Sequence, residues 1–241
     1  MKKIALLIFL CALTASARAG SGFEQANAAY AAGNFDAAVK DDESDVAAGN
    51  WNANLFYNLG NAYFRAGDSG RAILNYERAL QLDPQLPEAD ANLRYVRDES
   101  RALEMTLPPW RNLYGLRDVR LLTWSACVLG WLAIFLLIWR RRGGMIALAV
   151  ICLLGAGTIA AGFFLAETGA HGKGAAIIVA KETQARVATA DTAGAVLFLP
   201  PGSEVQLLKQ RGEWTYAALP NDLRGWIPAN AAEKIRLTYG R

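Results

Sequence analysis

Residues 58–84 read NLGNAYFRAGDSGRAILNYERALQLDP, and this stretch decides the fold of the N-terminal half of the chain. Gly67 permits a tight turn in the middle of the stretch, and Pro84 cannot continue a helix. On either side of the turn, small and bulky apolar residues recur at helical spacing. They are Phe56, Leu59, Gly60 and Tyr63 before the turn, and Ala72, Tyr76 and Ala79 after it. The pattern predicts two antiparallel helices that cross closely at Gly60 and Ala72.

The same pattern occurs a second time upstream. AGNFDAAV at residues 32–39 recurs as AGDSGRAI at residues 66–73, an offset of 34 residues. That period is typical of tetratricopeptide repeats, and the downstream copy resembles that family closely. The upstream copy is degenerate, because Ala26 stands where the downstream copy has Gly60 and Asp42 stands where it has Tyr76.

Residues 20–104 are therefore predicted to form an all-α array of about two and a half repeats, completed by a helix from Pro87 to about Arg101. Members of the family bind extended peptides or partner helices along a concave face. The resemblance implies that this face includes Asn54, Tyr57, Asn61, Phe64 and Arg65. Packing of Tyr57 and Phe64 against the neighbouring repeat is an open alternative. Asn61 and Arg65 are the stronger candidates for peptide contacts.

Three apolar runs suggest export and membrane insertion. Residues 1–19 have the charged start, short apolar run and small-residue end of a cleaved signal peptide, with an uncleaved anchor as the alternative. Residues 121–139 and 145–166 carry no charge and predict two transmembrane helices. The arginine-rich residues 140–144 then form a cytoplasmic loop, which places the rest of the chain on the periplasmic side of a bacterial inner membrane. A juxtamembrane segment (105–120) and a linker (167–174) flank the two helices.

Residues 175–241 change to short β-prone runs separated by turns, which predicts a small all-β barrel. Gly-Glu-Trp at 212–214, followed by Tyr216 and the later Gly225-Trp226-Ile227, resembles a bacterial SH3-type domain. Trp214, Tyr216 and Trp226 are expected to form an aromatic groove. The alternative is that these aromatics build the core of the barrel. The candidate ligands are cell-wall glycan or peptide, a proline-rich segment, or another component of the same complex.

Composition argues against several classes of function. Residues 20–104 contain fourteen acidic and seven basic side chains, and the chain has no basic stripe suited to nucleic acid. The three cysteines lie in the apolar runs and the single histidine is His171, so neither a disulfide framework nor a zinc site is expected. No catalytic motif is found, and we expect a non-enzymatic protein without cofactors.

The order of segments, and the stretches YNLGNAY (57–63) and AILNYERAL (72–80), resemble the BatE family of aerotolerance-operon proteins. The resemblance implies a multidomain membrane protein that works beside von Willebrand A-domain membrane proteins and a MoxR-type ATPase. It predicts an inner-membrane adaptor that presents two recognition domains, in an envelope-stress complex. The alternative is an envelope sensor whose SH3-like domain binds the cell wall.

Overall fold

The computed structural model describes residues 22–105, 119–138, 143–168 and 174–237. The chain divides into two compact units: residues 106–175 form one, and the segments on either side of them join to form the other. The predicted signal peptide (1–19) lies outside the described residues. So do most of the predicted juxtamembrane segment, cytoplasmic loop and linker.

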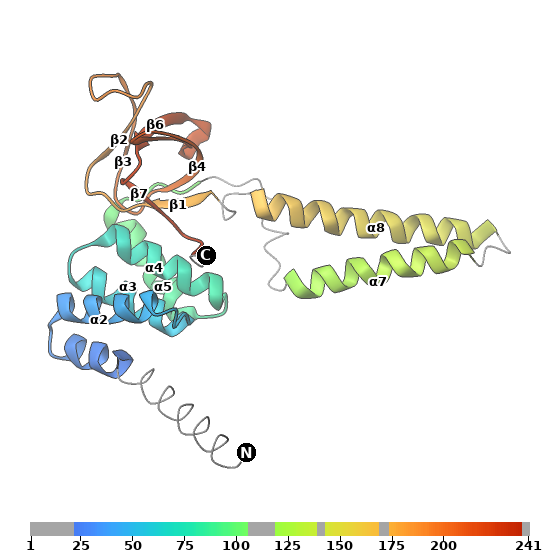
Figure 1. The fold of residues 1–241 in the computed structure, drawn as a ribbon, viewed down its shortest axis with the longest axis horizontal. Helices are drawn as coiled ribbons and strands as arrows, with labels where there is room; N and C mark the ends of the chain where they lie inside the picture. Colours follow the sequence, from blue (N-terminus) through green and yellow to red (C-terminus); the bar gives the residue numbers. More distant parts are fainter. Residues whose placement is uncertain (1–21, 106–118, 139–142, 169–173, 238–241) are drawn as a thin grey trace, which may run out of the picture. The chain divides into compact units, whose positions relative to one another are not determined.

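The first unit begins with five antiparallel helices (Figure 1). They are a helix at 22–31, α2 (Phe35–Ala47), α3 (Ala53–Arg65), α4 (Ser69–Leu82) and α5 (Pro87–Ser100). The Asn52 side chain caps α3 by accepting from the backbone N–H of Leu55, and Asp68 caps α4 in the same way. Pro87 stands in the first turn of α5, so the predicted additional helix is confirmed.

The predicted crossing of α3 and α4 is also confirmed. Gly60 lies against the ring of Tyr76, and a Cβ at position 60 would come within 2.7 Å of that ring. Phe56, Ala79 and Ala89 form a buried cluster that joins α3, α4 and α5. Glycine at the crossing thus lets a large aromatic side chain fill the volume between two closely packed helices.

The second part of this unit is a seven-stranded sheet in the order β3-β2-β6-β5-β4-β1-β7. Its pairs β1–β7, β2–β3, β2–β6, β4–β5 and β5–β6 are antiparallel. The strands are β1 (Ala175–Ile178), β2 (Thr183–Arg186), β3 (Ala195–Leu199), β4 (Glu204–Arg211), β5 (Trp214–Ala218), β6 (Arg224–Pro228) and β7 (Ala232–Lys234). Register shifts after Ala185 and Leu207 mark irregularities of the kind that bend and twist a sheet.

One face of the curved sheet holds the core. Along β5 the side chains alternate, with Thr215 and Ala217 buried and Trp214 and Tyr216 half-buried on the opposite face. The buried cluster consists of Ala176, Ile178, Ala185, Leu199, Val205, Ala217, Leu219 and Ile227. The small residues in this set allow the strands to curl tightly around the larger aliphatic side chains.

The helices and the sheet share a packed boundary. Leu103, which follows α5, packs against the core of the sheet, and Leu237 after β7 packs against the core of the helices. Arg97 of α5 contacts both Glu77 of α4 and Glu204 of β4. The first unit is therefore one body in which α4 faces the sheet.

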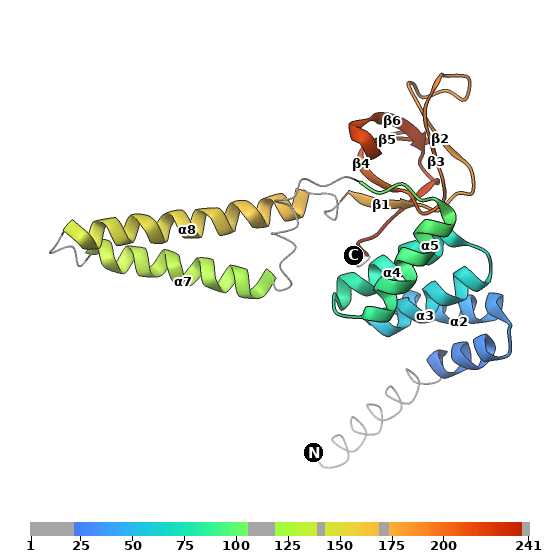
Figure 2. The ribbon, with the colours of Figure 1, turned by 180° about the vertical axis from the view of Figure 1, so that it is seen from behind.

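The second unit consists of α7 (Val119–Ile138) and α8 (Gly143–Thr168), which lie side by side (Figures 1 and 2). At their contact, a Cβ on Gly155 would meet Leu129 at 3.4 Å, and Ala133, Ala149 and Cys152 are buried. These buried side chains are small, which allows the two helices to approach closely.

The structure overturns the prediction of two transmembrane helices at 121–139 and 145–166. Among the described residues, no helix combines the length and the apolarity that a membrane crossing requires. A crossing needs about 20 consecutive apolar residues in one helix. The fold shown is an array of repeat-like helices followed by an antiparallel sheet.

Candidate functional site

Hydrogen-bonded asparagines connect the first helices of successive repeats. The Nδ2 of Asn58 on α3 donates to Oδ1 of Asn27 on the preceding helix at 3.0 Å. The Nδ2 of Asn92 on α5 donates to Oδ1 of Asn61 on α3 at 2.9 Å. Asn27 and Asn61 are 34 positions apart, as are Asn58 and Asn92. We call these four residues the asparagine ladder, and they run across the face built by the helix at 22–31, α3 and α5.

Asn61, one of the predicted peptide-contact residues, is part of this ladder. Its Oδ1 also accepts a hydrogen bond from the Tyr76 hydroxyl at 2.8 Å. Both lone pairs of that oxygen are therefore used within the fold, and a partner would meet the amide nitrogen instead. Of the other predicted contact residues, Asn54 is exposed, and exposed Arg65 places its guanidinium 4.7 Å from the centre of the Phe35 ring.

The two predicted aromatic contact residues, Tyr57 and Phe64, are half-buried on the same helix. The Tyr57 ring centre lies 6.1 Å from that of Tyr76. Phe64 meets Tyr95 of α5 edge to face at 5.9 Å. Tyr95 remains 61% exposed, so the Phe64–Tyr95 pair extends this face with an apolar surface that a partner can cover.

The degenerate first repeat contains a small cavity of about 40 Å³. Asp42 lines it and is only 2% exposed, yet its Oδ1 has no hydrogen-bond partner among the described residues. Burial, with added repulsion from the carboxylates of Asp45 and Asp41, raises the pKa of Asp42 to about 7. The remaining lining residues are Ala26, Asn27, Tyr30, Ala38, Asn58 and Asn61.

The predicted aromatic residues of the sheet all lie on its outward face. Tyr216 of β5 pairs with Trp226 of β6, and their ring centres are 5.1 Å apart. Trp214 stands two residues before Tyr216 on the same face and pairs with Pro228. All three aromatics are half-buried, and none of them belongs to the buried cluster of the sheet.

The hollows on the sheet open beside Trp214. One of about 480 Å³ and another of about 280 Å³ share Asp191, Trp214 and Pro228 as lining residues. Neither is lined by Tyr216 or Trp226. The polar residues Gln210, Glu213 and Asn230 line the larger hollow. The structure thus offers an indole flanked by carboxylate and amide groups, which is a suitable surface for polar, hydrogen-bonding ligands.

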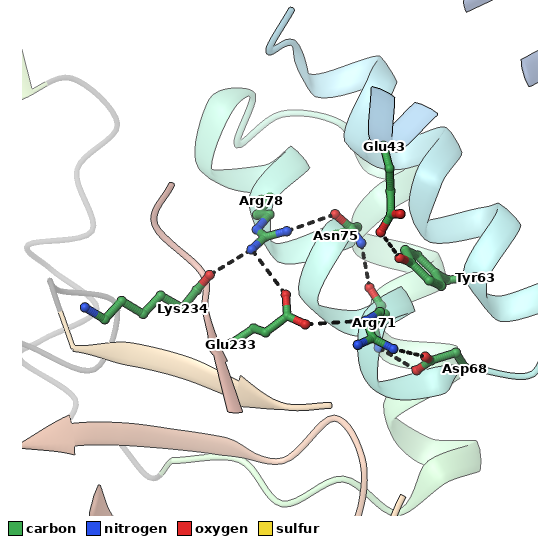
Figure 3. Close-up of polar contacts among 8 residues, drawn as sticks. All are labelled: Glu43, Tyr63, Asp68, Arg71, Asn75, Arg78, Glu233 and Lys234. Atoms are coloured by element: carbon green, nitrogen blue, oxygen red, sulfur yellow. Dashed lines mark hydrogen bonds and ion pairs between the residues drawn. The ribbon is translucent and has the colours of Figure 1, made fainter. Parts of the chain in front are cut away.

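Another surface of the helices is occupied by the sheet (Figure 3). Arg78 of α4 donates to the backbone oxygen of Lys234 at 3.0 Å. Glu233 forms ion pairs with both Arg78 and Arg71. Burial lowers the pKa of Arg78, and the Glu233 carboxylate opposes that effect. The neighbouring Tyr63 hydroxyl donates to Glu43, which ties α3 to α2.

Sequence reasoning missed Asn27, Asn58, Asn92 and Tyr95 on the ladder face, and Asp191 and Asn230 on the sheet. The asparagines carry a usable signal, since the four residues of the ladder form two pairs that are 34 positions apart. The residues around Trp214 carry none, because loops separated in sequence bring them together.

The tetratricopeptide repeat family model matches residues 53–86. This match covers α3, α4 and the turn that follows. Tetratricopeptide repeats are units of stacked helices that mediate protein–protein interactions along an extended surface. No curated protein matches the chain.

Proposed function

We propose that this protein is a non-enzymatic adaptor that binds a partner protein along the asparagine ladder face. The proposal rests on which helices pack against the sheet and which helices keep an exposed face. The second helix of the matched repeat, α4, packs toward the sheet through Arg71 and Arg78. The face of the first helices keeps Asn54, Arg65 and Tyr95 exposed.

The chemistry of this face suits an extended peptide or a helix. Asparagine side chains offer both donors and acceptors, which can pair with a peptide backbone. The Phe64–Tyr95 pair supplies an aromatic surface close to the ladder. The acidic excess of residues 20–104 favours a partner segment with positive charge.

In-cell crosslinking tests the proposal. A photoreactive residue at Asn54 should yield a discrete protein adduct, whereas one at Gln81, exposed at the end of α4, should not. The variant Tyr95→Ala should reduce the Asn54 adduct without loss of thermal stability, because that ring is largely exposed. Equal adducts from both positions, or none from either, would show that the ladder face is not the binding surface.

The sheet supplies a second recognition surface in this proposal. Its short antiparallel strands and the outward-facing Trp214, Tyr216 and Trp226 support the interpretation of this sheet as an SH3-type domain. The ligand would meet Trp214 and the hollows beside Asp191. Sedimentation of the full chain with purified cell-wall sacculi tests a glycan or peptide ligand: a wall ligand requires co-sedimentation that Trp214→Ala abolishes, whereas Tyr95→Ala should leave it intact.

Von Willebrand A-domain proteins and a MoxR-type ATPase are the first candidates to look for among the Asn54 adducts, because the sequence resembles the BatE family. Export by residues 1–19 is also a proposal, since it rests on the sequence of that segment alone. Sequencing the N-terminus of the protein purified from cells tests cleavage of this segment: a new start near Gly20 supports a cleaved signal peptide, and an intact Met1 supports an uncleaved anchor.

A further inference from the structure

The cavity in the first repeat lies where the second repeat holds an aromatic ring. Ala26 and Asp42 stand 34 positions before Gly60 and Tyr76. In the second repeat the Tyr76 ring fills the space against Gly60. In the first repeat the side chain of Asp42 is too short to fill that space, and a cavity of about 40 Å³ remains. The cavity of the first repeat therefore corresponds to the space that the Tyr76 ring fills in the second repeat.

The first repeat also lacks the donor that the second repeat has. The Tyr76 hydroxyl donates to Oδ1 of Asn61. At the equivalent place Asp42 presents a carboxyl group to the cavity that Asn27 also lines, and an ionised carboxylate can only accept. Asn27 Oδ1 receives the hydrogen bond from Asn58 and has a second lone pair. Two acceptors therefore border the same small space, and a hydrogen-bond donor between them would satisfy both.

The charge around the cavity determines which donor fits. Asp41 and Asp45 on α2 add negative charge next to Asp42. The other helices contribute Tyr30, Asn58 and Asn61, none of which supplies a counter-ion. A buried carboxylate without a counter-ion is costly, so a cationic donor is favoured over a neutral one. The carboxyl with a pKa of about 7 is close to ionisation at neutral pH, which a nearby cation would complete.

The size of the cavity favours an ammonium group over a guanidinium group. A single water-sized group needs about 10–15 Å³ of such space, so 40 Å³ accommodates an ammonium group and the last carbon of its chain. A planar guanidinium has more heavy atoms and a fixed fork. Asn27 is exposed and Tyr30 is half-buried, so a long, thin side chain can enter from the ladder face.

We propose that this cavity binds the ammonium group of a lysine side chain from a protein partner. Asp42 is the counter-ion, and the side-chain oxygen of Asn27 is the second acceptor. The inference rests on the proposed function, because it treats the ladder face as the surface that a partner covers. It adds the chemistry of one anchor: a lysine of the partner takes the place of the Tyr76 hydroxyl in the first repeat.

The test uses the full chain with aspartate carboxyl carbons labelled for NMR, and n-butylammonium chloride as the probe. Butylammonium should lower the apparent pKa of Asp42 and shift the side-chain amide signals of Asn27 and Asn58 in a saturable way. Tetramethylammonium has the same charge but no N–H donor, and it should do neither. Equal effects of the two cations, or no effect of butylammonium, would overturn the proposal.

The matched control is the double variant Ala26→Gly/Asp42→Tyr, which copies the Gly60–Tyr76 pair into the first repeat. Glycine is needed at position 26 because a Cβ at the equivalent position 60 would meet the tyrosine ring at 2.7 Å. This variant should fold, fill the cavity and lose the butylammonium response. A folded double variant that keeps the response would show that the cation binds elsewhere.

Partner capture from Asn54 separates failure of this inference from failure of the adaptor proposal. If the wild type captures a partner at Asn54, Asp42→Asn should reduce the yield of that adduct about tenfold. The substitution keeps the size of the side chain but removes the buried counter-ion of the lysine. Undiminished capture would overturn the lysine anchor and leave the adaptor proposal standing. Absence of any capture in the wild type would overturn the adaptor proposal, and the butylammonium titration would still decide whether the cavity binds an ammonium group.

Discussion

Arg97 and Glu204 are 107 positions apart in the sequence, and their side chains form an ion pair between α5 and β4. The same guanidinium contacts Glu77 of α4 at 2.6 Å and Glu104 at 3.8 Å, so one cation pairs with three carboxylates. The Arg97 side chain is 12% exposed, and Glu77 and Glu204 are similarly covered. The Glu204 carboxylate also accepts the backbone N–H of Met105 at 3.0 Å. The junction of helices and sheet is therefore a polar network centred on Arg97, although the Nε of Arg97 has no hydrogen-bond partner among the described residues.

Replacement of Arg97 by alanine should destabilise the protein strongly. It removes the cation that the nearly buried carboxylates of Glu77 and Glu204 share, which costs roughly 3–5 kcal/mol of unfolding free energy. Urea denaturation, followed by circular dichroism and tryptophan fluorescence, measures this cost. The control is Arg94→Ala on the same helix, where an exposed pair with Asp90 is worth less than about 0.5 kcal/mol. Similar effects of the two substitutions would contradict a structural role for the Arg97 network.

Gly202 should resist substitution because it touches the helices. Its φ of +89° disfavours other residues, and an added Cβ would overlap Ile73 Cδ1 of α4 and lie 3.2 Å from the Cβ of Ala102. Gly202→Ala should therefore cost the backbone strain, about 1 kcal/mol, and a further 1–3 kcal/mol from overpacking.

The control for Gly202 is Gly212, another glycine of the sheet with positive φ, here +59°. A Cβ at Gly212 would meet nothing within 4 Å, so Gly212→Ala should cost the strain alone. Thermal melts of the two variants measure the difference. Equal losses would show that Gly202 does not need close contact with α4.

Local pattern predicted the helices of the array well. The spacing of Leu59, Gly60, Tyr63 and Tyr76 specified the crossing of α3 and α4, because a helix period and a missing side chain are both visible in sequence. The prediction of membrane spans was wrong because an uninterrupted apolar run does not by itself establish a membrane-spanning helix. None of the described helices is both long enough and apolar enough to cross a membrane.

The boundary between helices and sheet could not be predicted from sequence. Its pairs, such as Arg97–Glu204 and Arg78–Lys234, join residues more than a hundred positions apart, and no periodicity connects them. The ladder face could be predicted from sequence in part. Its asparagines repeat at the period of the array, but the hydrogen bonds between Asn58 and Asn27 depend on how neighbouring repeats stack.

Gly60→Ala should destabilise the helical array despite the higher helix propensity of alanine. The new Cβ would lie 2.7 Å from Cε1 of Tyr76, a ring that is fully buried and cannot move aside. Overpacking of this kind costs about 1–3 kcal/mol. Gly130→Ala in α7 is the control, because its Cβ would meet nothing within 4 Å and alanine should be neutral or slightly stabilising there. Chemical denaturation compares them, and an unaffected Gly60→Ala would contradict the tight crossing.

Asp42→Asn should stabilise the protein in a pH-dependent way. Burial first, and then Asp45 and Asp41, raise the pKa of Asp42 from 3.8 to about 7 in the folded state. The folded protein therefore holds a proton between these two values that the unfolded chain has lost, so the stability of the wild type falls as pH rises through this window. Below pH 4 both states are protonated and the variant should gain little. Above pH 7 the wild type carries the full cost of a buried carboxylate, a few kcal/mol, which asparagine avoids.

Denaturation of both proteins at pH 4, 6 and 8 measures the difference in their unfolding free energies. This difference must grow with pH, and a constant difference would mean that Asp42 titrates normally. Adding n-butylammonium at pH 8 should narrow the gap by stabilising the wild type alone, since only the carboxylate can pair with the cation.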